Sequence, residues 1–136
     1  MMIDEIEVEL KLTEWAADVL GLAIDSGIYR GSIPSGARSG VAVMLHEEIR
    51  DATLRPSTYN VQILGKFAGD DARDDALRMR ARLAAAVPRF GVTVDGVTFT
   101  AIQPRGGGEP YRADDDGEIK TYMSVNLLVS VLTNRP

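Results

Sequence analysis

Residues 92–99 read VTVDGVTF, an Asp-Gly pair between two runs rich in β-branched and aromatic residues. Both central positions of a two-residue hairpin turn need a positive φ, which Asp and Gly adopt more easily than other residues. The stretch therefore predicts two antiparallel strands joined at Asp95 and Gly96. It places a sheet in the second half of the chain, and the neighbouring segments can be assigned around it.

A helix is predicted directly before this hairpin, from a cap at Asp70 or Asp71 to a stop at Pro88. Aspartates occupy its first turns and arginines its C-terminal half, which suits the helix dipole. Its apolar stripe has members three or four residues apart: Ala72, Ala76, Met79 and Leu83. The stripe predicts that this helix packs on one face of the sheet.

Further strands are predicted on both sides of this helix and hairpin. Apolar and polar residues alternate over residues 59–67 and again over residues 122–132, which is typical of half-buried strands. A short apolar run at residues 41–45 predicts one more strand, bounded by Gly40 and a charged segment that begins at His46.

The remaining segments are predicted to be a helix, a connector and a loop. Apolar residues at helical spacing predict a helix over residues 3–26, with Gly27 as its C-cap. Residues 27–40 contain four glycines, a proline and three serines, and are predicted to be a connector. The polar segment between Pro104 and Ile119 is predicted to be a long loop, or the arm of a long hairpin if its flanking strands pair.

Together these segments predict one α+β domain over residues 1–136. We expect an N-terminal helix, a mixed or antiparallel sheet of about four to five strands, a second helix packed on one face, and a long C-terminal hairpin. The chain has no cysteine, which excludes disulfides and thiolate metal sites. No apolar run is long enough for a bilayer, and the first residues are acidic where a signal peptide would be basic, so neither membrane insertion nor secretion is expected.

The motifs that could carry chemistry have simpler interpretations. His46 is the only histidine, and Arg50 stands where a zinc-protease helix needs its second histidine, so a solvated turn is expected. Aspartates 114–116 before Gly117 lack the ligand spacing of a calcium-binding loop. A solvated or partner-facing loop is expected there, with a weaker divalent-cation site as the alternative. The glycines at positions 106–108 lack the lysine of a phosphate-binding loop.

No catalytic, cofactor-binding or metal-binding residue is predicted. One histidine and no cysteine leave little from which to build a nucleophile and its base. A net charge of −5 argues against a dedicated binder of duplex DNA, which needs a basic surface. These features favour a protein that acts through its surfaces.

Three stretches resemble one family of phage proteins. Residues 28–34, IYRGSIP, resemble its early tyrosine-glycine-aliphatic-proline segment, and residues 59–65, YNVQILG, resemble its middle strand before an Asp-rich capped helix. Residues 94–104, followed by Asp116 and Gly117 before an alternating terminal strand, resemble its C-terminal half. The family is that of the tail terminators or minor capsid (tail completion) proteins of long-tailed bacteriophages.

This resemblance implies a virion structural protein that is not an enzyme and needs no cofactor. Such a protein caps the tail tube as a ring, usually of six copies, and ends tube polymerisation. Its partners would be the tail tube protein and a head-completion or neck protein, and DNA would pass through the lumen without sequence-specific binding. Its place would be the neck of the virion, at the top of the tail, and the host cytoplasm during assembly.

Two alternatives remain open. One is a head-closure or other neck connector protein, and the other, from a different class, is a small bacterial ligand-binding module or small-ligand enzyme. For the leading interpretation, we expect the interfaces in the connector and in the polar segment before Ile119, because an extended arm or an uncovered sheet edge can pair across chains. The candidate interface residues are Tyr29, Arg30, Arg38, Arg105, Glu109, Tyr111, Arg112, Asp114, Asp115 and Asp116.

Overall fold

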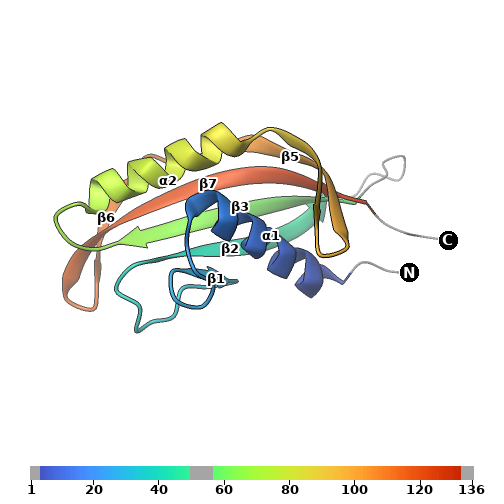
Figure 1. The fold of residues 1–136 in the computed structure, drawn as a ribbon. Helices are drawn as coiled ribbons and strands as arrows, with labels where there is room; N and C mark the ends of the chain where they lie inside the picture. Colours follow the sequence, from blue (N-terminus) through green and yellow to red (C-terminus); the bar gives the residue numbers. More distant parts are fainter. Residues whose placement is uncertain (1–3, 50–56, 133–136) are drawn as a thin grey trace.

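A computed structural model describes residues 4–49 and 57–132 of the chain (Figure 1). Its elements follow the order α, β, β, β, α and then four strands. They are α1 (Glu5–Leu20), β1 (Ile28–Arg30), β2 (Gly40–Ile49), β3 (Ser57–Phe67), α2 (Ala72–Ala86), β4 (Arg89–Val94), β5 (Val97–Gly107), β6 (Tyr111–Asp115) and β7 (Glu118–Val131).

The strands form one mixed sheet in the order β1-β2-β3-β7-β5-β4, with β6 also paired to β7. Every pair is antiparallel except β1 with β2. The predicted α+β class is therefore confirmed, although the sheet has seven strands and not four to five.

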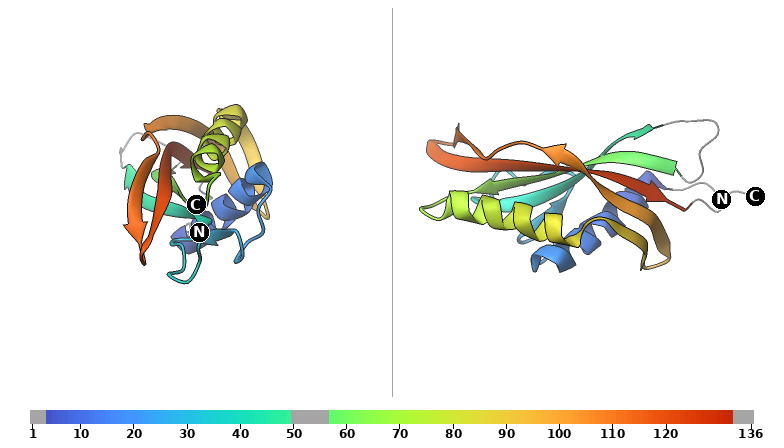
Figure 2. Two further views of the ribbon diagram at one scale, coloured as in Figure 1. Left: turned by 90° about the vertical axis from the view of Figure 1, so that its left-hand side faces the viewer. Right: turned by 90° about the horizontal axis from the view of Figure 1, so that it is seen from above.

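Both helices lie on the same face of the curled sheet (Figure 2). The alternation predicted for β3 and β7 is confirmed, since Tyr59, Val61 and Ile63 are buried against the helices while the residues between them are only partly buried. The core combines this inner sheet face with one stripe from each helix: Val8, Leu12, Trp15, Ala76, Met79, Leu83, Phe99, Met123, Leu127 and Val129.

Helix α1 is shorter than the sequence predicted. Asp4 caps its start by accepting a hydrogen bond from the N–H of Ile6 at 3.0 Å. The helix ends at Gly21, whose φ of 67° is the left-handed conformation of a helix C-cap. The prediction of a helix through residue 26 with Gly27 as its cap is therefore wrong, because Gly21 meets the requirement six residues earlier. Residue 3 lies outside the described residues.

Part of the predicted connector is a strand. Ile28 is fully buried, and β1 pairs in parallel with the start of β2, with Ile28 opposite Val41. Strand β2 also continues past Leu45 to Ile49, through residues predicted to lie outside it. The charged residues are tolerated there because a shift in register between Leu45 and Glu48 and an uncovered outer face leave them in contact with water.

The strongest local predictions are confirmed, apart from the cap of α2. Helix α2 begins after Asp71, buries its predicted stripe and ends before Pro88, but the side chain of Asp71 makes no capping hydrogen bond. Asp95 and Gly96 have φ values of 47° and 84°, as a two-residue turn between β4 and β5 requires.

The segment between Pro104 and Ile119 is not a long loop. Strand β5 runs to Gly107, and β6 then continues along the same edge of β7. Asp116 and Gly117, with φ values of 54° and 83°, form a second two-residue turn. Strands β5, β6 and β7 thus make the predicted long C-terminal hairpin, with ordered strands almost to its tip.

The carboxylate of Glu9 connects α1 to the irregular part of β2. One oxygen accepts a hydrogen bond from the backbone N–H of Leu45 at 2.8 Å, and the other accepts one from the Arg30 guanidinium at 2.9 Å. The backbone N–H of Val41 and the C=O of Val43 bond towards β1, so the N–H of Leu45, two residues further along the strand, points to the same edge. Strand β1 pairs only as far as Val43, so the N–H of Leu45 needs an acceptor outside the sheet ladder.

Replacing Glu9 tests this connection. Glu9→Ala leaves the N–H of Leu45 without its acceptor and should lower the free energy of unfolding in urea by about 1–2 kcal/mol. Glu9→Gln keeps one acceptor oxygen and should lose less. The control is Glu5→Ala, an exposed position on the same helix, with an expected change within about 0.5 kcal/mol. Equal losses for Glu5→Ala and Glu9→Ala would show that the contact contributes little.

Candidate interaction surfaces

One carboxylate holds the far end of the long hairpin to the body of the sheet. The side chain of Asp115 on β6 accepts hydrogen bonds from Lys66 on β3 at 3.1 Å and from Lys120 on β7 at 2.6 Å. Both lysines are buried, at 6% and 5% exposure. A buried ammonium group without a counter-charge is costly, so Asp115 makes the burial of both lysines possible.

A second ion pair joins the hairpin to the segment between β1 and β2. The guanidinium of Arg38 donates two hydrogen bonds to the carboxylate of Glu118, one of them at 3.1 Å. Two parallel hydrogen bonds of this kind fix orientation as well as distance. Because Glu118 directly follows the turn, the tip of the hairpin is attached at two neighbouring points. We call the residues Arg38, Lys66, Asp115, Glu118 and Lys120 the hairpin clamp.

The clamp shifts the protonation of its members. The hydrogen bonds from Lys120 and then Lys66 lower the pKa of Asp115, and the hydrogen bond from Arg38 lowers the pKa of Glu118. The hydrogen bond to Asp115 raises the pKa of Lys120. The carboxylates are therefore held charged in the folded state, and their contribution to stability falls when the pH drops through their folded pKa values.

Half of the predicted interface residues are engaged within the chain. Five of the ten lie beside a partner. Arg30 pairs with Glu9, Arg38 with Glu118, and Glu109 with Arg80 at 3.3 Å. Tyr111 stacks on Tyr122 with ring centroids 5.4 Å apart, and Asp115 lies between its two lysines. These contacts hold the hairpin and the β1–β2 segment in place. Their participation in an interface stays a prediction.

The other predicted interface residues do not converge on one point. Arg112, Asp114 and Asp116 are exposed at the hairpin tip, and Arg105 is exposed further back on β5. Tyr29 is half-buried on β1, with its ring against Gly40. Ile119, which was not among the candidates, is 51% exposed beside the tip. The tip thus carries charges of both signs next to an exposed apolar side chain.

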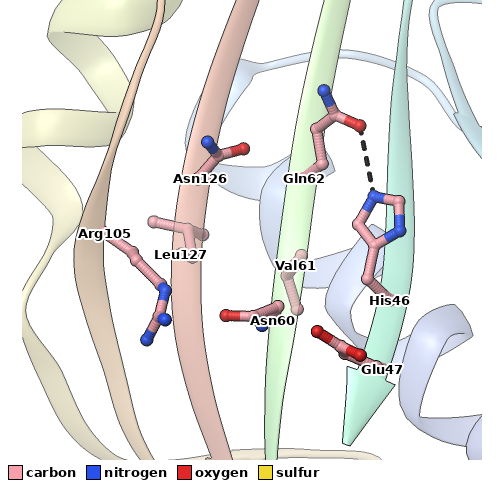
Figure 3. A pocket seen from close by; sticks show the side chains of 8 residues that line it. All are labelled: His46, Glu47, Asn60, Val61, Gln62, Arg105, Asn126 and Leu127. Atoms are coloured by element: carbon pink, nitrogen blue, oxygen red, sulfur yellow. Dashed lines mark hydrogen bonds between the residues drawn. The ribbon is translucent and has the colours of Figure 1, made fainter.

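The outer face of the sheet has a shallow polar hollow of about 520 Å³ (Figure 3). His46 and the side-chain oxygen of Gln62 are 3.2 Å apart, and the amide of Gln62 donates to the hydroxyl of Ser124 at 2.7 Å. The side-chain oxygen of Asn60 is buried and has no hydrogen-bond partner in the described structure, and Figure 3 shows it pointing towards β7. The hollow also contains Arg105.

The chemistry of this hollow is that of hydrogen bonding. Its side chains can donate and accept hydrogen bonds, and Arg105 and Glu47 add one charge of each sign.

His46 lies on a strand and not in the predicted turn. Arg50, which the comparison with a zinc-protease helix used, lies outside the described residues. Within residues 4–49 and 57–132 no three His, Cys, Asp or Glu side chains are grouped as a metal ion requires. No helix in the described part is long and apolar enough to cross a membrane.

Sequence reasoning missed the clamp for an identifiable reason. Lys66 lies on the parity of β3 that the alternation predicts to be solvated, and Asp115 lies in a segment predicted to be a loop. Lys120 lies between that loop and the predicted last strand, where no element was assigned. One available signal was overlooked. The Asp-Gly pair at Asp116 has the same turn chemistry as the pair at Asp95, and it predicts a hairpin that brings Asp115 opposite Glu118.

The chain was compared with known proteins. No protein-family model matches it, and a search of curated proteins finds no match. Among solved structures, it is similar to a chain of the "Virion of native gene transfer agent (GTA) particle". The two chains are 15% identical, and the similarity covers 93% of this chain and 91% of that chain with a TM-score of 0.49. At this level the likeness says nothing about function.

The clamp predicts an acid-sensitive hairpin. Lowered carboxyl pKa values add stability above the unfolded values of 3.8 for Asp115 and 4.5 for Glu118, and this stability is lost as the pH falls through the folded values. Asp115→Asn should therefore lower the melting temperature by several degrees at pH 7, and the difference from the wild type should shrink towards pH 2. The measurement is thermal unfolding followed by circular dichroism.

Asp114→Asn is the matched control for this experiment. Asp114 is the exposed neighbour of Asp115 and points to the opposite side of the strand. Its substitution should leave the melting temperature at pH 7 unchanged. A difference between wild type and Asp115→Asn that stays constant from pH 7 to pH 2 would contradict an ionic origin.

Proposed function

We propose that this chain is a virion structural protein that acts by self-assembly and has no catalytic centre. Specifically, it would form the ring that caps the tail tube of a long-tailed phage and joins the tail to the head. The proposal rests on the resemblance of residues 28–34, 59–65 and 94–104 to the tail terminator family and on the surfaces described above. Its partners would be copies of itself, the tail tube protein and a head-completion or neck protein.

The observation that carries the proposal is the hairpin tip, which ion pairs attach to the sheet and which carries exposed side chains. The clamp holds the end of the hairpin, while Arg112, Asp114 and Ile119 remain exposed on it. A surface that is ordered before binding loses less entropy when it binds. Exposed charges of both signs beside an apolar side chain are suited to a specific contact with a neighbouring subunit.

A ring requires two different surfaces on each subunit. In a closed ring the contact is heterologous, so one patch of a subunit meets a different patch of the next. The hairpin tip lies at one end of the molecule, and the turn between β4 and β5 lies at the opposite end (Figure 1). An elongated subunit with distinct ends can satisfy this geometry. The ring, its copy number and its place in the neck are parts of the proposal.

The outer-face hollow supports a second candidate, a small ligand-binding module. The unpaired oxygen of Asn60 needs a donor, and Arg105 offers a cation nearby in the same hollow. We rank this candidate second because the hollow is open and shallow, whereas small-molecule sites usually enclose most of their ligand. A head-closure or other neck connector protein would use the same exposed tip, so it differs from the leading proposal only in its partners.

Charge exchange at the tip tests the proposal. The double variant Arg112→Glu/Asp114→Lys keeps the number of charged groups and leaves the clamp intact, so the fold should be unchanged. We expect it to raise the protein concentration needed for ring formation at least about tenfold, which corresponds to about 1.4 kcal/mol. Sedimentation velocity and electron microscopy measure the rings, with tail tube protein added if the chain alone stays monomeric.

Glu47→Lys is the control variant. Glu47 is exposed on the outer face of β2, away from the hairpin tip. It should form rings like the wild type. Deleting residues 106–117 would be a poor test, since it would also remove the carboxylate between two buried lysines. If the double variant assembled as readily as the wild type, the hairpin tip would not be an assembly surface.

A further inference from the structure

Strand β4 has one backbone edge without a strand partner in the described structure, because it ends the strand order of the sheet. Gly91 has a φ of 69°, and the pairing of β5 with β7 shifts register between Phe99 and Ala101, so the β4–β5 hairpin is irregular at this level. The ammonium of Lys11 on α1 donates to the carboxylate of Asp95 in the turn at 3.1 Å. This contact fixes the tip of the β4–β5 hairpin beside the helix.

Between α1 and β4 lies a hollow of about 450 Å³. Its strand side includes three consecutive residues, 92–94, so it reaches the backbone of β4 as well as its side chains. Its apolar lining is Trp15, Val19, Ala86, Val92 and Val94. Its charged lining is Glu14, Asp18 and Arg89. The hollow is therefore a groove of mixed polar and apolar lining with a mainly acidic rim.

The register shows that Thr93 offers free backbone groups on this edge. In a two-residue hairpin the flanking residues, Val94 and Val97, exchange both backbone hydrogen bonds. The next pair, Thr93 and Thr98, is then the type without backbone hydrogen bonds between its members, and the 3.0 Å contact between its two hydroxyls fits that close spacing. The N–H and C=O of Thr93 consequently point away from β5.

We propose that this groove accepts an extended, basic segment of a partner protein as an additional strand beside β4. Backbone groups of the segment would pair with those of Thr93. Alternate side chains would enter the groove over Trp15, and the apolar ones would be buried there. Lysine or arginine side chains of the segment would meet Glu14 and Asp18 on the helix side of the groove.

The acidic rim decides which kind of segment fits. Two carboxylates, Glu14 and Asp18, and the guanidinium of Arg89 line the groove. Lys11 is paired with Glu14 at 3.3 Å and with Asp95 at 3.1 Å, so Asp18 is the groove carboxylate that has no ion pair in the described structure. An acidic segment would face like charges at short range, whereas a basic one would be attracted. The inference depends on the proposed function only for the source of the segment, which would be a neighbouring protein in the assembly. The turn between β4 and β5, at the end of the strand that lines the groove, lies at the other end of the molecule from the hairpin tip (Figure 1).

The chain contains its own reporter for this site. Trp15 is the only tryptophan, lines the groove and is 8% exposed, so its emission should respond to occupancy. The probes are two blocked seven-residue peptides, one alternating valine with lysine and one alternating valine with glutamate. We expect the valine–lysine peptide to shift the Trp15 emission and to slow exchange of the Thr93 amide proton. The valine–glutamate peptide should bind at least tenfold more weakly.

Two variants and a control locate the binding. Thr93→Pro removes an N–H that points away from β5, and Asp18→Lys reverses a charge on the groove wall; each should weaken the valine–lysine peptide at least tenfold. Asp74→Lys, an equal charge change on exposed α2, should not. If Thr93→Pro does not fold, the affinity of Asp18→Lys for the valine–lysine peptide alone shows whether the peptide binds in the groove.

Three results would overturn the inference. They are equal binding of the two peptides, no binding of the valine–lysine peptide at millimolar concentration, and unchanged binding by the Asp18→Lys variant. Protection of the Thr93 amide that grows with protein concentration and without peptide would instead make a second copy the occupant. Peptide binding is measured on the unassembled chain. The peptide can therefore fail to bind while rings still form, and it can bind while no rings form.

Discussion

The carboxylate of Asp115 lies between the ammonium groups of Lys66 and Lys120, and the shape of one end of the molecule depends on this contact. Without a counter-charge the two buried lysines would repel each other and would favour water over the sheet. With it, β6 closes against β7, and the pair Arg38–Glu118 attaches the turn to the β1–β2 segment. A short, polar pair of strands is thus held to the sheet by charge pairing, whereas other parts of the sheet are held by apolar burial.

This balance also explains which parts of the fold the sequence could predict. Helix α2 and the β4–β5 hairpin carry their signals within a few residues, as an apolar stripe that ends at a proline and as an Asp-Gly turn, and both elements were predicted correctly. The burial of Lys66 depends on a residue 49 positions away, so the alternation of β3 could not reveal it. Local patterns record which face a residue occupies, but not which distant segment later covers that face.

Strand β1 and the end of α1 were missed for a different reason. Glycine-rich sequence was taken as a connector, although a strand at the edge needs only a few residues and one buried side chain, here Ile28. Gly21 was passed over because apolar spacing continues beyond it, yet a left-handed glycine ends a helix whatever follows. None of the candidate interface residues could be ranked from sequence, since pairing with Glu9 or Glu118 depends on the tertiary fold.

The two ends of the molecule offer two different kinds of surface. At the hairpin tip, contacts would be made by side-chain charges, which are screened by salt. At the β4 edge, contacts would be made by backbone groups and by apolar side chains over Trp15, together with charges that meet Glu14 and Asp18. Salt screens the charged part of both contacts, but it leaves the backbone and apolar part of the contact at β4. The contact at β4 should therefore keep part of its strength at an ionic strength that removes the charge contacts of the tip.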